Sequence, residues 1–227
     1  MIELKTLGVL RTDFMQKFGT PRQGSLAKSS RGRVELEAQW RGRGIFVGLE
    51  GFSHVWLITY LHLNGQLSER GKIHPPRLRG GKVGILASRS PHRPNNIGLT
   101  LAKIEKCIDD ELWVSEIDLV DGTPILDIKP YVAEADRPLE YKNGWLEGAQ
   151  FSLRECEFLE TAMQKIKALP EPDRFKSLIF EMLSLDPRSP AYLGKEQVDF
   201  YVWVDGYNVS FEYRDEKFFV KDIEPLA

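Results

Sequence analysis

The feature that most limits the fold is a succession of short apolar segments across the first 120 residues, without helical segments between them. These segments are about as long as strands, are rich in β-branched and aromatic residues, and are separated by Gly and Pro. The pattern predicts strands at Glu3–Leu10, Arg33–Gln39, Val55–His62, Lys82–Ala87, Gly98–Cys107 and Leu112–Leu119. Because the strands of a parallel βαβ sheet alternate with helices, this order instead predicts a sandwich or a barrel.

The pattern changes after Ala149, where a first helix is expected. Ser152 and Glu155 match the Ser-x-x-Glu capping box that starts many helices. Pro170 and Pro172 are then expected to end this helix. Its apolar face is predicted to consist of Phe158, Ala162, Ile166 and Leu169.

A second helix and three strands are predicted to follow. Asp173 is placed to cap this helix. Its apolar face is predicted to consist of Phe175, Leu178, Ile179 and Met182. Residues 198–223 form three alternating runs, separated by the Asp205-Gly206 and Asp215-Glu216 turns. The chain is therefore predicted to be mainly β, with a first domain at residues 1–148 and a small α+β domain at 149–227 that holds two helices and a three-stranded antiparallel meander.

Composition places the chain among globular proteins. Apolar residues make up 42% of its 227 residues, which is enough to bury a core. Cys107 and Cys156 lack the spacing of a metal or redox motif and are predicted to be free thiols in a reducing compartment. No apolar run approaches the roughly 18 residues of a membrane span, and the N-terminus lacks a signal-peptide pattern. We therefore expect a soluble, cytoplasmic protein that does not bind membranes.

The net charge of −2 hides an uneven distribution. Residues 1–100 hold 16 Lys and Arg against 6 Asp and Glu, whereas residues 101–227 hold 15 against 27. A basic first half predicts a surface for a polyanion, although a dipolar surface without a partner explains the same composition.

Several common catalytic and cofactor motifs are absent from the sequence. It contains no Rossmann glycine fingerprint, no P-loop, no Gly-x-Ser-x-Gly and no His-Glu-x-x-His. Its histidines and cysteines do not show a zinc-ligand spacing, so no metal site is expected. These absences disfavour a Rossmann oxidoreductase or methyltransferase, a P-loop NTPase and a zinc protease.

The loop from Ser88 to Gly98 combines stiffness with many hydrogen-bond donors. Pro91 and Pro94 fix the backbone, so the loop loses little entropy when it orders around a ligand. Arg89 and Arg93 carry planar guanidinium groups that can bind a carboxylate or phosphate through two hydrogen bonds. A rigid connector between strands is the alternative, but the coincidence of stiffness and donors favours a binding role.

Three carboxylates, those of Asp118, Asp121 and Asp127, fall within ten residues of an otherwise apolar stretch. Half-buried carboxylates need partners. Ribose hydroxyls, a ligand ammonium or the arginines of the Ser88–Gly98 loop would serve, although Asp121-Gly122 is also an ordinary turn signal.

The remaining polar segments carry little weight singly. Lys17–Gly24 is a loop fixed by Gly and Pro, in which Arg22 and Gln23 are planar donors. Pro75–Lys82 is a second basic segment with a proline pair. His62 ends an apolar strand, where a histidine is more often structural than catalytic.

Together these segments resemble the TsaA-like (TrmO/YaeB) family of tRNA methyltransferases. The matching motifs are Gly-Thr-Pro-Arg-Gln, Pro-Pro-Arg-x-x-Gly-Gly, Arg-Ser-x-x-Arg-Pro-Asn-x-Ile-Gly and Asp-Leu-Val-Asp-Gly-Thr-Pro-x-Leu-Asp-Ile-Lys-Pro-Tyr, between Leu4 and Asp136. The tail adds Asp186-Pro-Arg and Pro190-Ala-Tyr192. Asn96 stands where the family commonly has Pro, and Ser189 interrupts the tail motif.

The resemblance implies that the first domain is a β-barrel, acting as a homodimer with cofactor sites near the subunit interface. It implies S-adenosylmethionine-dependent methylation of N6-threonylcarbamoyladenosine, the modified base on the 3′ side of the tRNA anticodon. The positions that match the family's cofactor site are Pro21, Arg22, Gln23, His62, Leu63, Arg89, Leu99, Asp118, Leu119, Val120, Asp121 and Gly122.

The chemistry of these residues fits such a cofactor. Arg89 suits its carboxylate, and a carboxylate between Asp118 and Asp121 suits its ammonium or ribose. Backbone groups near Leu99 and Leu119 suit the adenine edge. The basic residues expected to contact tRNA are Lys28, Arg31, Arg33, Arg77, Arg79, Arg93 and Arg188.

The amide-like nitrogen of the substrate must lose its proton when it is methylated. His62 or Asp127 could accept that proton, and transfer without a protein base is a third possibility. Two other functions stay open: methylation of another RNA or of a small molecule with the same cofactor, and a non-catalytic tRNA-binding module.

Overall fold

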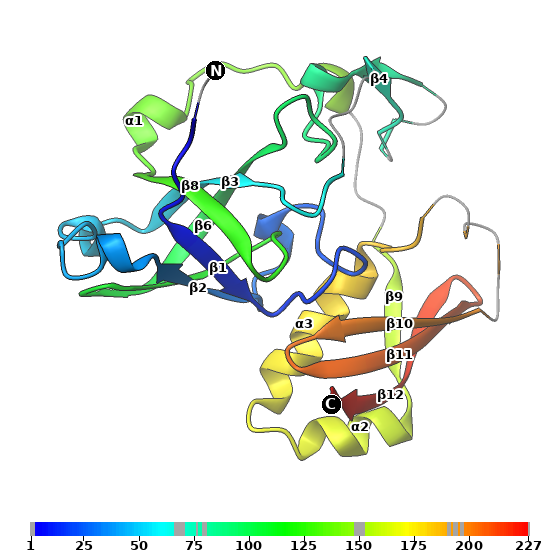
Figure 1. The fold of residues 1–227 in the computed structure, drawn as a ribbon. Helices are drawn as coiled ribbons and strands as arrows, with labels where there is room; N and C mark the ends of the chain where they lie inside the picture. Colours follow the sequence, from blue (N-terminus) through cyan, green and yellow to red (C-terminus); the bar gives the residue numbers. More distant parts are fainter. Residues whose placement is uncertain are drawn as a thin grey trace.

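We describe the chain from a computed structural model, which covers residues 3–65, 71–75, 77–78, 81–147, 153–189, 192, 195 and 198–226. Two sheets dominate it (Figure 1): a closed barrel and a separate four-stranded sheet with two helices beside it. A short ladder pairs β4 (Lys72–Ile73) with β5 (Val83–Gly84), and a single helical turn, α1 (Ala133–Asp136), follows the last barrel strand. The prediction of a mainly β protein with a barrel is confirmed.

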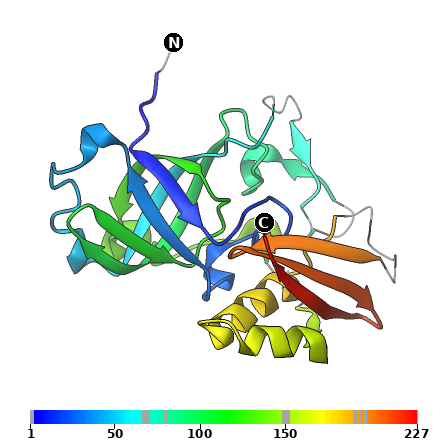
Figure 2. The same cartoon turned by 60° about the horizontal axis from the view of Figure 1, so that its bottom comes forward.

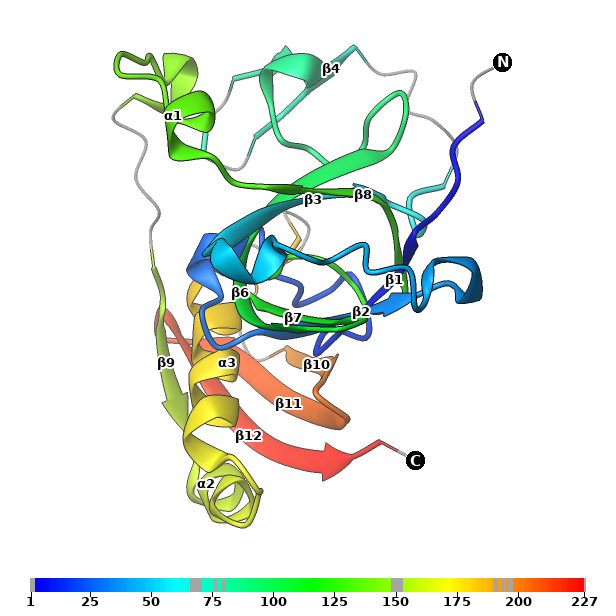
Figure 3. The same ribbon diagram turned by 90° about the vertical axis from the view of Figure 1, so that its left-hand side faces the viewer.

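Six strands close the barrel, which Figure 3 shows as a ring. In the order of the ring they are β1 (Gly8–Thr12), β2 (Arg31–Leu36), β7 (Glu111–Ser115), β6 (Ile97–Ile108), β3 (His54–Tyr60) and β8 (Thr123–Pro130). Because successive side chains of a strand point to opposite faces, Val55 and Leu57 of β3 are buried inside the barrel with Leu10 and Leu112. This core fills the barrel and leaves polar residues at its ends.

The strand predictions for the barrel fail at two places. Lys82–Ala87 forms only the two-residue β5 and then a 3-10 turn at Ile85–Ala87. The strand β8 was not predicted, because Pro124 and Pro130 disfavour a strand in the middle of a sheet. The other predicted barrel strands are present with shifted ends, and His62 lies in a turn beyond β3.

The C-terminal part holds a sheet in the order β10-β11-β12-β9. Its elements are β9 (Glu155–Phe158), α2 (Glu160–Lys167), α3 (Pro172–Ser184), β10 (Asp199–Val204), β11 (Tyr207–Arg214) and β12 (Lys217–Pro225). The apolar faces of both helices pack with the sheet in one core, as the helical spacing predicts. Among the described residues the longest helix has 13 residues, and no helix there has the length and apolar composition to cross a bilayer.

The first helix of this part begins later than the sequence predicts. Residues Glu155–Phe158 form β9, parallel to β12, and α2 starts at Glu160. Because polar and apolar residues alternate in β9, its two glutamates pair with Lys217 at 2.7 and 2.9 Å while the other two side chains pack against the core. The predicted three-stranded meander is therefore extended to a four-stranded mixed sheet. Ser152, the other member of the predicted capping box, lies outside the described residues.

Pro172 begins α3 instead of ending the first helix. Proline suits the first position of a helix, where its missing N–H costs nothing. Glu171 is consequently the N-cap residue, and Asp173 lies in the first turn. The hairpin turn between β10 and β11 is confirmed, with φ of 50° at Asp205 and 78° at Gly206.

The segment after β1 joins the barrel to the C-terminal sheet (Figure 2). Phe14 is 1% exposed and belongs to the core of the C-terminal part. The amide of Asp205 donates to the carbonyl of Asp13 at 2.7 Å, and the amide of Met15 donates to that of Trp203 at 3.3 Å. The two parts are therefore packed together by backbone contacts. The predicted boundary between residues 148 and 149 falls within residues 148–152, which lie outside the described residues, and it stays a prediction.

Candidate functional site

Three polar segments far apart in the sequence meet at one end of the barrel: the loop after β1, the turn beyond β3 and the turn before β8. Lys17 Nζ donates to the carbonyl of Leu63. The carboxylate of Asp121 accepts from the amide of Thr12 at 3.0 Å. The amide of Asp121 donates to the carbonyl of Phe14 at 2.7 Å. The fold thus brings together three of the segments that the sequence assigns to a cofactor.

The carboxylate of Asp118 links these three segments to a fourth, the loop from Ser88 to Gly98 that carries Arg89. Burial raises the pKa of Asp118, against the hydrogen bonds from Thr100 Oγ1 (2.5 Å) and the Gly24 amide and the nearby charge of Arg89. Gly24 approaches the backbone so closely that a Cβ there would lie 1.8 Å from the carbonyl oxygen of Glu116. Asp118 therefore contacts the loop that ends at Gly24 and lies within electrostatic range of Arg89.

Internal hydrogen bonds hold the loop that carries Arg89. Arg93 Nη1 donates to the carbonyl of Ser88 at 2.8 Å. The amide of Leu61 donates to the carbonyl of Asn96, also at 2.8 Å. Asn96 is 2% exposed and has a φ of 48°, which proline cannot adopt. Asparagine tolerates this left-handed conformation, so Asn96 suits the backbone of the loop. Arg93, predicted as an RNA contact, braces the loop, whereas Arg89 is exposed.

His62 lies in the same group, in the turn beyond β3. Burial lowers the pKa of His62, the charge of Lys17 lowers it further, and Asp121 acts in the opposite direction. With a pKa below its usual value of about 6.5, the imidazole is neutral at pH 7 and can accept a proton.

Asp127, the other candidate base, lies away from His62. It pairs with Ile58 in the middle of β3, and its carboxylate is 2.8 Å from Lys129 Nζ. It borders a second cavity, of about 460 Å³, together with Phe46 and other residues of the segment before β3. Asp127 and His62 therefore lie apart, and the choice between them as the base stays a prediction.

The other predicted cofactor positions lie on β6 and in the segment between β7 and β8, and they differ in exposure. Leu99 lies on the outer face and is 58% exposed, whereas Leu119 is 4% exposed. The carbonyl of Val120 accepts from Thr123, and the amide of Gly122 donates to the carbonyl of Leu10. Leu119 therefore offers little exposed surface, and a cofactor contact at these positions stays a prediction.

Besides Arg93, two of the predicted RNA contacts are engaged within the protein. Arg188 is 4% exposed, bonds both carboxylate oxygens of Asp186 at 2.8 Å and stacks 3.5 Å from the ring centre of Tyr213. This burial disfavours an RNA contact, because the guanidinium would have to leave its partners, and the contact stays a prediction. Arg31 forms two hydrogen bonds to Glu171, at 2.5 and 2.7 Å.

The remaining basic residues differ in their accessibility. Lys28 and Arg33 are exposed, and Arg33 lies 5.5 Å from the ring centre of Trp113. Arg77 is half-buried, and Arg79 lies outside the described residues. An RNA contact stays a prediction for these four residues.

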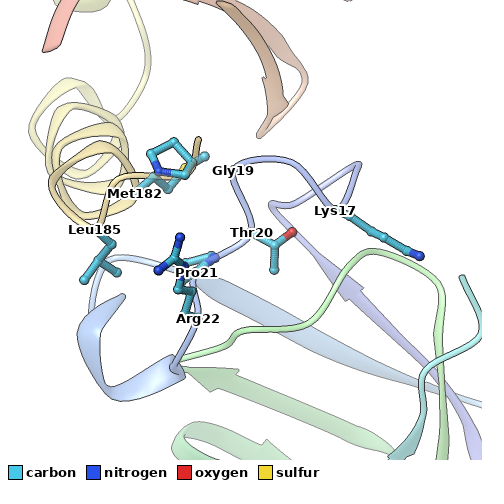
Figure 4. A pocket seen from close by; sticks show the side chains of 8 residues that line it. Lys17, Gly19, Thr20, Pro21, Arg22, Met182 and Leu185 are labelled. Carbon is cyan, nitrogen blue, oxygen red and sulfur yellow. The ribbon is translucent and has the colours of Figure 1, made fainter. Parts of the chain in front are cut away.

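Residues of the C-terminal part border the predicted cofactor loop, which sequence reasoning missed. A pocket of about 180 Å³ is lined by Pro21 and Arg22 on one side and by Met182, Leu185 and Pro187 on the other. Figure 4 shows Pro21 and Arg22 facing the end of α3, while Lys17 extends away from it. The sequence offered no signal for this contact, because Met182 only fits the apolar face of a helix. Gln23, next in the loop, is half-buried.

Comparison with known families covers both parts of the chain. The model of the tRNA-methyltransferase O N-terminal domain matches residues 9–137, and that of the TrmO C-terminal domain matches residues 153–226. A tRNA (adenine(37)-N6)-methyltransferase of Escherichia coli K12 is 34% identical over 233 residues, covering 98% of each chain. The human protein of the same name is 49% identical over 134 residues, which are 58% of this chain. The chain spans only about a third of the length of its mammalian relatives.

A relative from Pseudomonas aeruginosa, described as a putative S-adenosylmethionine-dependent methyltransferase, is 40% identical over 191 residues, 82% of this chain and 81% of its own. The crystal structure of TrmO from Pseudomonas aeruginosa has a TM-score of 0.79 and 31% identity, covering 99% of this chain and 98% of its own. Both family models and a relative that is matched over 98% of each chain thus point to one family. The chain belongs to the TrmO family.

Proposed function

We propose that this protein uses S-adenosylmethionine to methylate N6 of N6-threonylcarbamoyladenosine at position 37 of tRNA. The observation that carries the proposal is the meeting of Arg89, Asp118, His62 and the loop of residues 17–24 at one end of the barrel. The names of the relatives support the cofactor and the tRNA position. The threonylcarbamoyl group follows from the family resemblance.

The groups at this end of the barrel fit S-adenosylmethionine. The exposed guanidinium of Arg89 suits a carboxylate. The carboxylates of Asp118 and Asp121 suit an ammonium group or ribose hydroxyls, and the close backbone approach at Gly24 leaves main-chain groups near them. When bound, the cofactor supplies an electrophilic methyl group. The part of this chain is to hold both reactants in position, and we propose that neutral His62 accepts the proton that leaves the substrate nitrogen.

The cofactor assignment is tested by the variant Arg89→Ala. We expect its dissociation constant for S-adenosylmethionine to rise about 10- to 100-fold, because a hydrogen-bonded charge pair is lost. Isothermal titration calorimetry without tRNA measures this directly. Arg89→Lys keeps the charge but lacks the planar guanidinium group, so its dissociation constant should lie between those of the unchanged protein and Arg89→Ala. Unchanged affinity in Arg89→Ala would remove Arg89 from the cofactor site.

The proposed substrate is tested with purified protein, labelled S-adenosylmethionine and tRNA that either carries or lacks the threonylcarbamoyl group. We expect methyl transfer only to the modified tRNA. Transfer to both tRNAs would show that the enzyme does not require the threonylcarbamoyl group. Binding of tRNA without any transfer would indicate a non-catalytic module.

We further propose that the protein acts as a homodimer in the cytoplasm. The absence of a disulfide at Cys107 and Cys156 supports a reducing compartment. For the dimer, the support is an apolar strip on the outer face of β3 and β6, where Tyr60, Ile97 and Leu99 are 42%, 41% and 58% exposed. Strand pairing places them side by side: Tyr60 lies opposite Ile97, and Leu99 lies opposite Ile58, the preceding outward-facing residue of β3. Such a strip is typical of a protein interface.

The dimer is tested by Leu99→Asp, which places a charge in this strip. We expect the dimer dissociation constant, measured by analytical ultracentrifugation, to rise at least about tenfold. Val47→Asp is the matched control, because Val47 is 86% exposed and lies on the segment before β3. Equal dimer stability in both variants would place the interface elsewhere.

A further inference from the structure

The turn that follows α3 is built around a buried arginine. Arg188 bonds both carboxylate oxygens of Asp186 at 2.8 Å, and its guanidinium stacks 3.5 Å from the ring centre of Tyr213 and 5.3 Å from that of Phe218. Both rings belong to the C-terminal sheet. Such a planar, two-point contact fixes the orientation of Asp186 relative to that sheet.

The backbone of Asp186 is held in a conformation that needs such support. Its φ is 51°, a left-handed value that non-glycine residues adopt only when their surroundings favour it. In this conformation its carbonyl accepts a hydrogen bond from Arg22 Nη2 at 3.1 Å. The residues on either side, Leu185 and Pro187, line the pocket next to Pro21. The backbone of this turn therefore reaches the proposed cofactor loop, while the side chain of Arg188 is buried in the protein.

We propose that Asp186 and Arg188 are positioning residues that hold the loop of residues 17–23 in its cofactor-binding conformation through Arg22. This inference rests on the proposed function, since it assigns that loop to the cofactor. The chain of contacts runs from Tyr213 through Arg188 and Asp186 to Arg22. Its consequence is that cofactor affinity depends on the C-terminal part even without tRNA. A preorganised loop binds more tightly because it does not have to be ordered on binding.

The competing role for this turn is direct contact with tRNA. The burial and double pairing of Arg188 disfavour it, because the guanidinium would have to leave its partners to reach a phosphate. The two roles make opposite predictions. A positioning role changes affinity for S-adenosylmethionine in the absence of tRNA, whereas an RNA contact changes affinity for tRNA alone.

The test compares Arg188→Lys and Asp186→Gly with the unchanged protein. Lysine cannot reproduce the planar fork, and glycine keeps the left-handed backbone but removes the carboxylate. We expect the dissociation constant for S-adenosylmethionine, measured by calorimetry without tRNA, to rise about tenfold in both. The affinity for tRNA, measured by filter binding without cofactor, should stay within about twofold. Arg214→Lys is the matched control, since Arg214 also stacks on an aromatic ring, 4.4 Å from the centre of Phe219, but is exposed.

A double variant separates positioning from general loss of stability. Arg22→Ala alters an exposed side chain and should weaken S-adenosylmethionine binding by itself. Adding Arg188→Lys to it should then weaken binding by less than Arg188→Lys does alone, because both act through one contact. Fully additive losses, unchanged cofactor affinity in Arg188→Lys, or a loss confined to tRNA would each overturn the inference. If the unchanged protein does not bind S-adenosylmethionine, the proposed function fails and the inference fails with it.

Discussion

Replacing His62 with asparagine is expected to lower kcat for methyl transfer by about 10²- to 10⁴-fold, the usual contribution of a positioned general base. His62 lies in the turn beyond β3, near Lys17 and Asp121. Because its pKa is lowered, it is neutral at pH 7 and free to accept a proton. Single-turnover rates with modified tRNA measure the effect. The affinity for S-adenosylmethionine, measured by calorimetry, should change by less than about tenfold, since asparagine retains a polar side chain.

The pH dependence gives a second measure of the same role. The neutral form of His62 is the active one, so kcat should fall as the pH drops through a pKa below about 6.5. Lys17→Met removes a cation that lowers this pKa. The acidic limb of the profile should therefore move to higher pH in Lys17→Met and disappear in His62→Asn.

Asp127→Asn is the matched control for a carboxylate base. Asp127 is paired with Lys129 and borders the other cavity, so we expect kcat to change by less than about threefold. A large loss in this variant with normal kcat in His62→Asn would reverse the assignment. Normal kcat in both variants would indicate transfer without a protein base.

The candidate site could be predicted because its segments are specific in sequence. The motifs around Arg22, Arg89 and Asp118 are each long enough to identify a family, although no periodicity places them near one another. Closure of the barrel brings them together, so that the charge of Arg89 acts on the carboxylate of Asp118 although the two residues are 29 positions apart. Gly24 illustrates what the sequence alone does not reveal. A glycine is required there because the carbonyl of Glu116 lies too close for a Cβ, and this contact is visible only in the folded chain.

The places where the structure differs from the sequence-based expectation share one cause. The burial and the partners of a residue depend on tertiary contacts that its local sequence does not contain. Arg188 is a cation in a loop motif, and the rings of Tyr213 and Phe218 that cover it come from strands more than twenty residues later. The β9 segment was read as part of a helix because Glu155 completes a capping box, while the lysine that pairs with it lies on β12. Asp127 shares a motif with Asp118, but β8 carries it to the other cavity, and its role as a base stays a prediction.

A buried ion pair between Arg174 and Asp13 lies where the barrel meets the C-terminal part, and its removal should strongly lower the stability of the protein. Arg174→Met is expected to lower the free energy of unfolding by about 3 to 5 kcal/mol, the usual loss when one partner of a buried ion pair is removed. Arg174 contacts Asp13 at 3.1 Å, Asp205 and the Ser29 carbonyl at 3.2 Å, and it is largely buried. Urea unfolding followed by fluorescence measures the change. Arg31→Met is the control: its pair with Glu171 is half exposed on both sides and should contribute less than about 1 kcal/mol.

The charge of Asp13 determines how this loss varies with pH. Burial raises the pKa of Asp13 to about 6, although Arg174 opposes the rise. The folded protein therefore binds this proton more tightly than the unfolded chain does, so Asp13 contributes a decrease in stability as the pH rises from about 4 to 6. Removing Arg174 raises this pKa further, so the loss in Arg174→Met should be smaller at pH 5 than at pH 7. Asp13→Asn should abolish that difference, and combined with Arg174→Met it should restore part of the stability at pH 7, because the buried carboxylate is gone. A loss in Arg174→Met that is independent of pH and is not relieved by Asp13→Asn would show that Arg174 acts through packing and not through its charge.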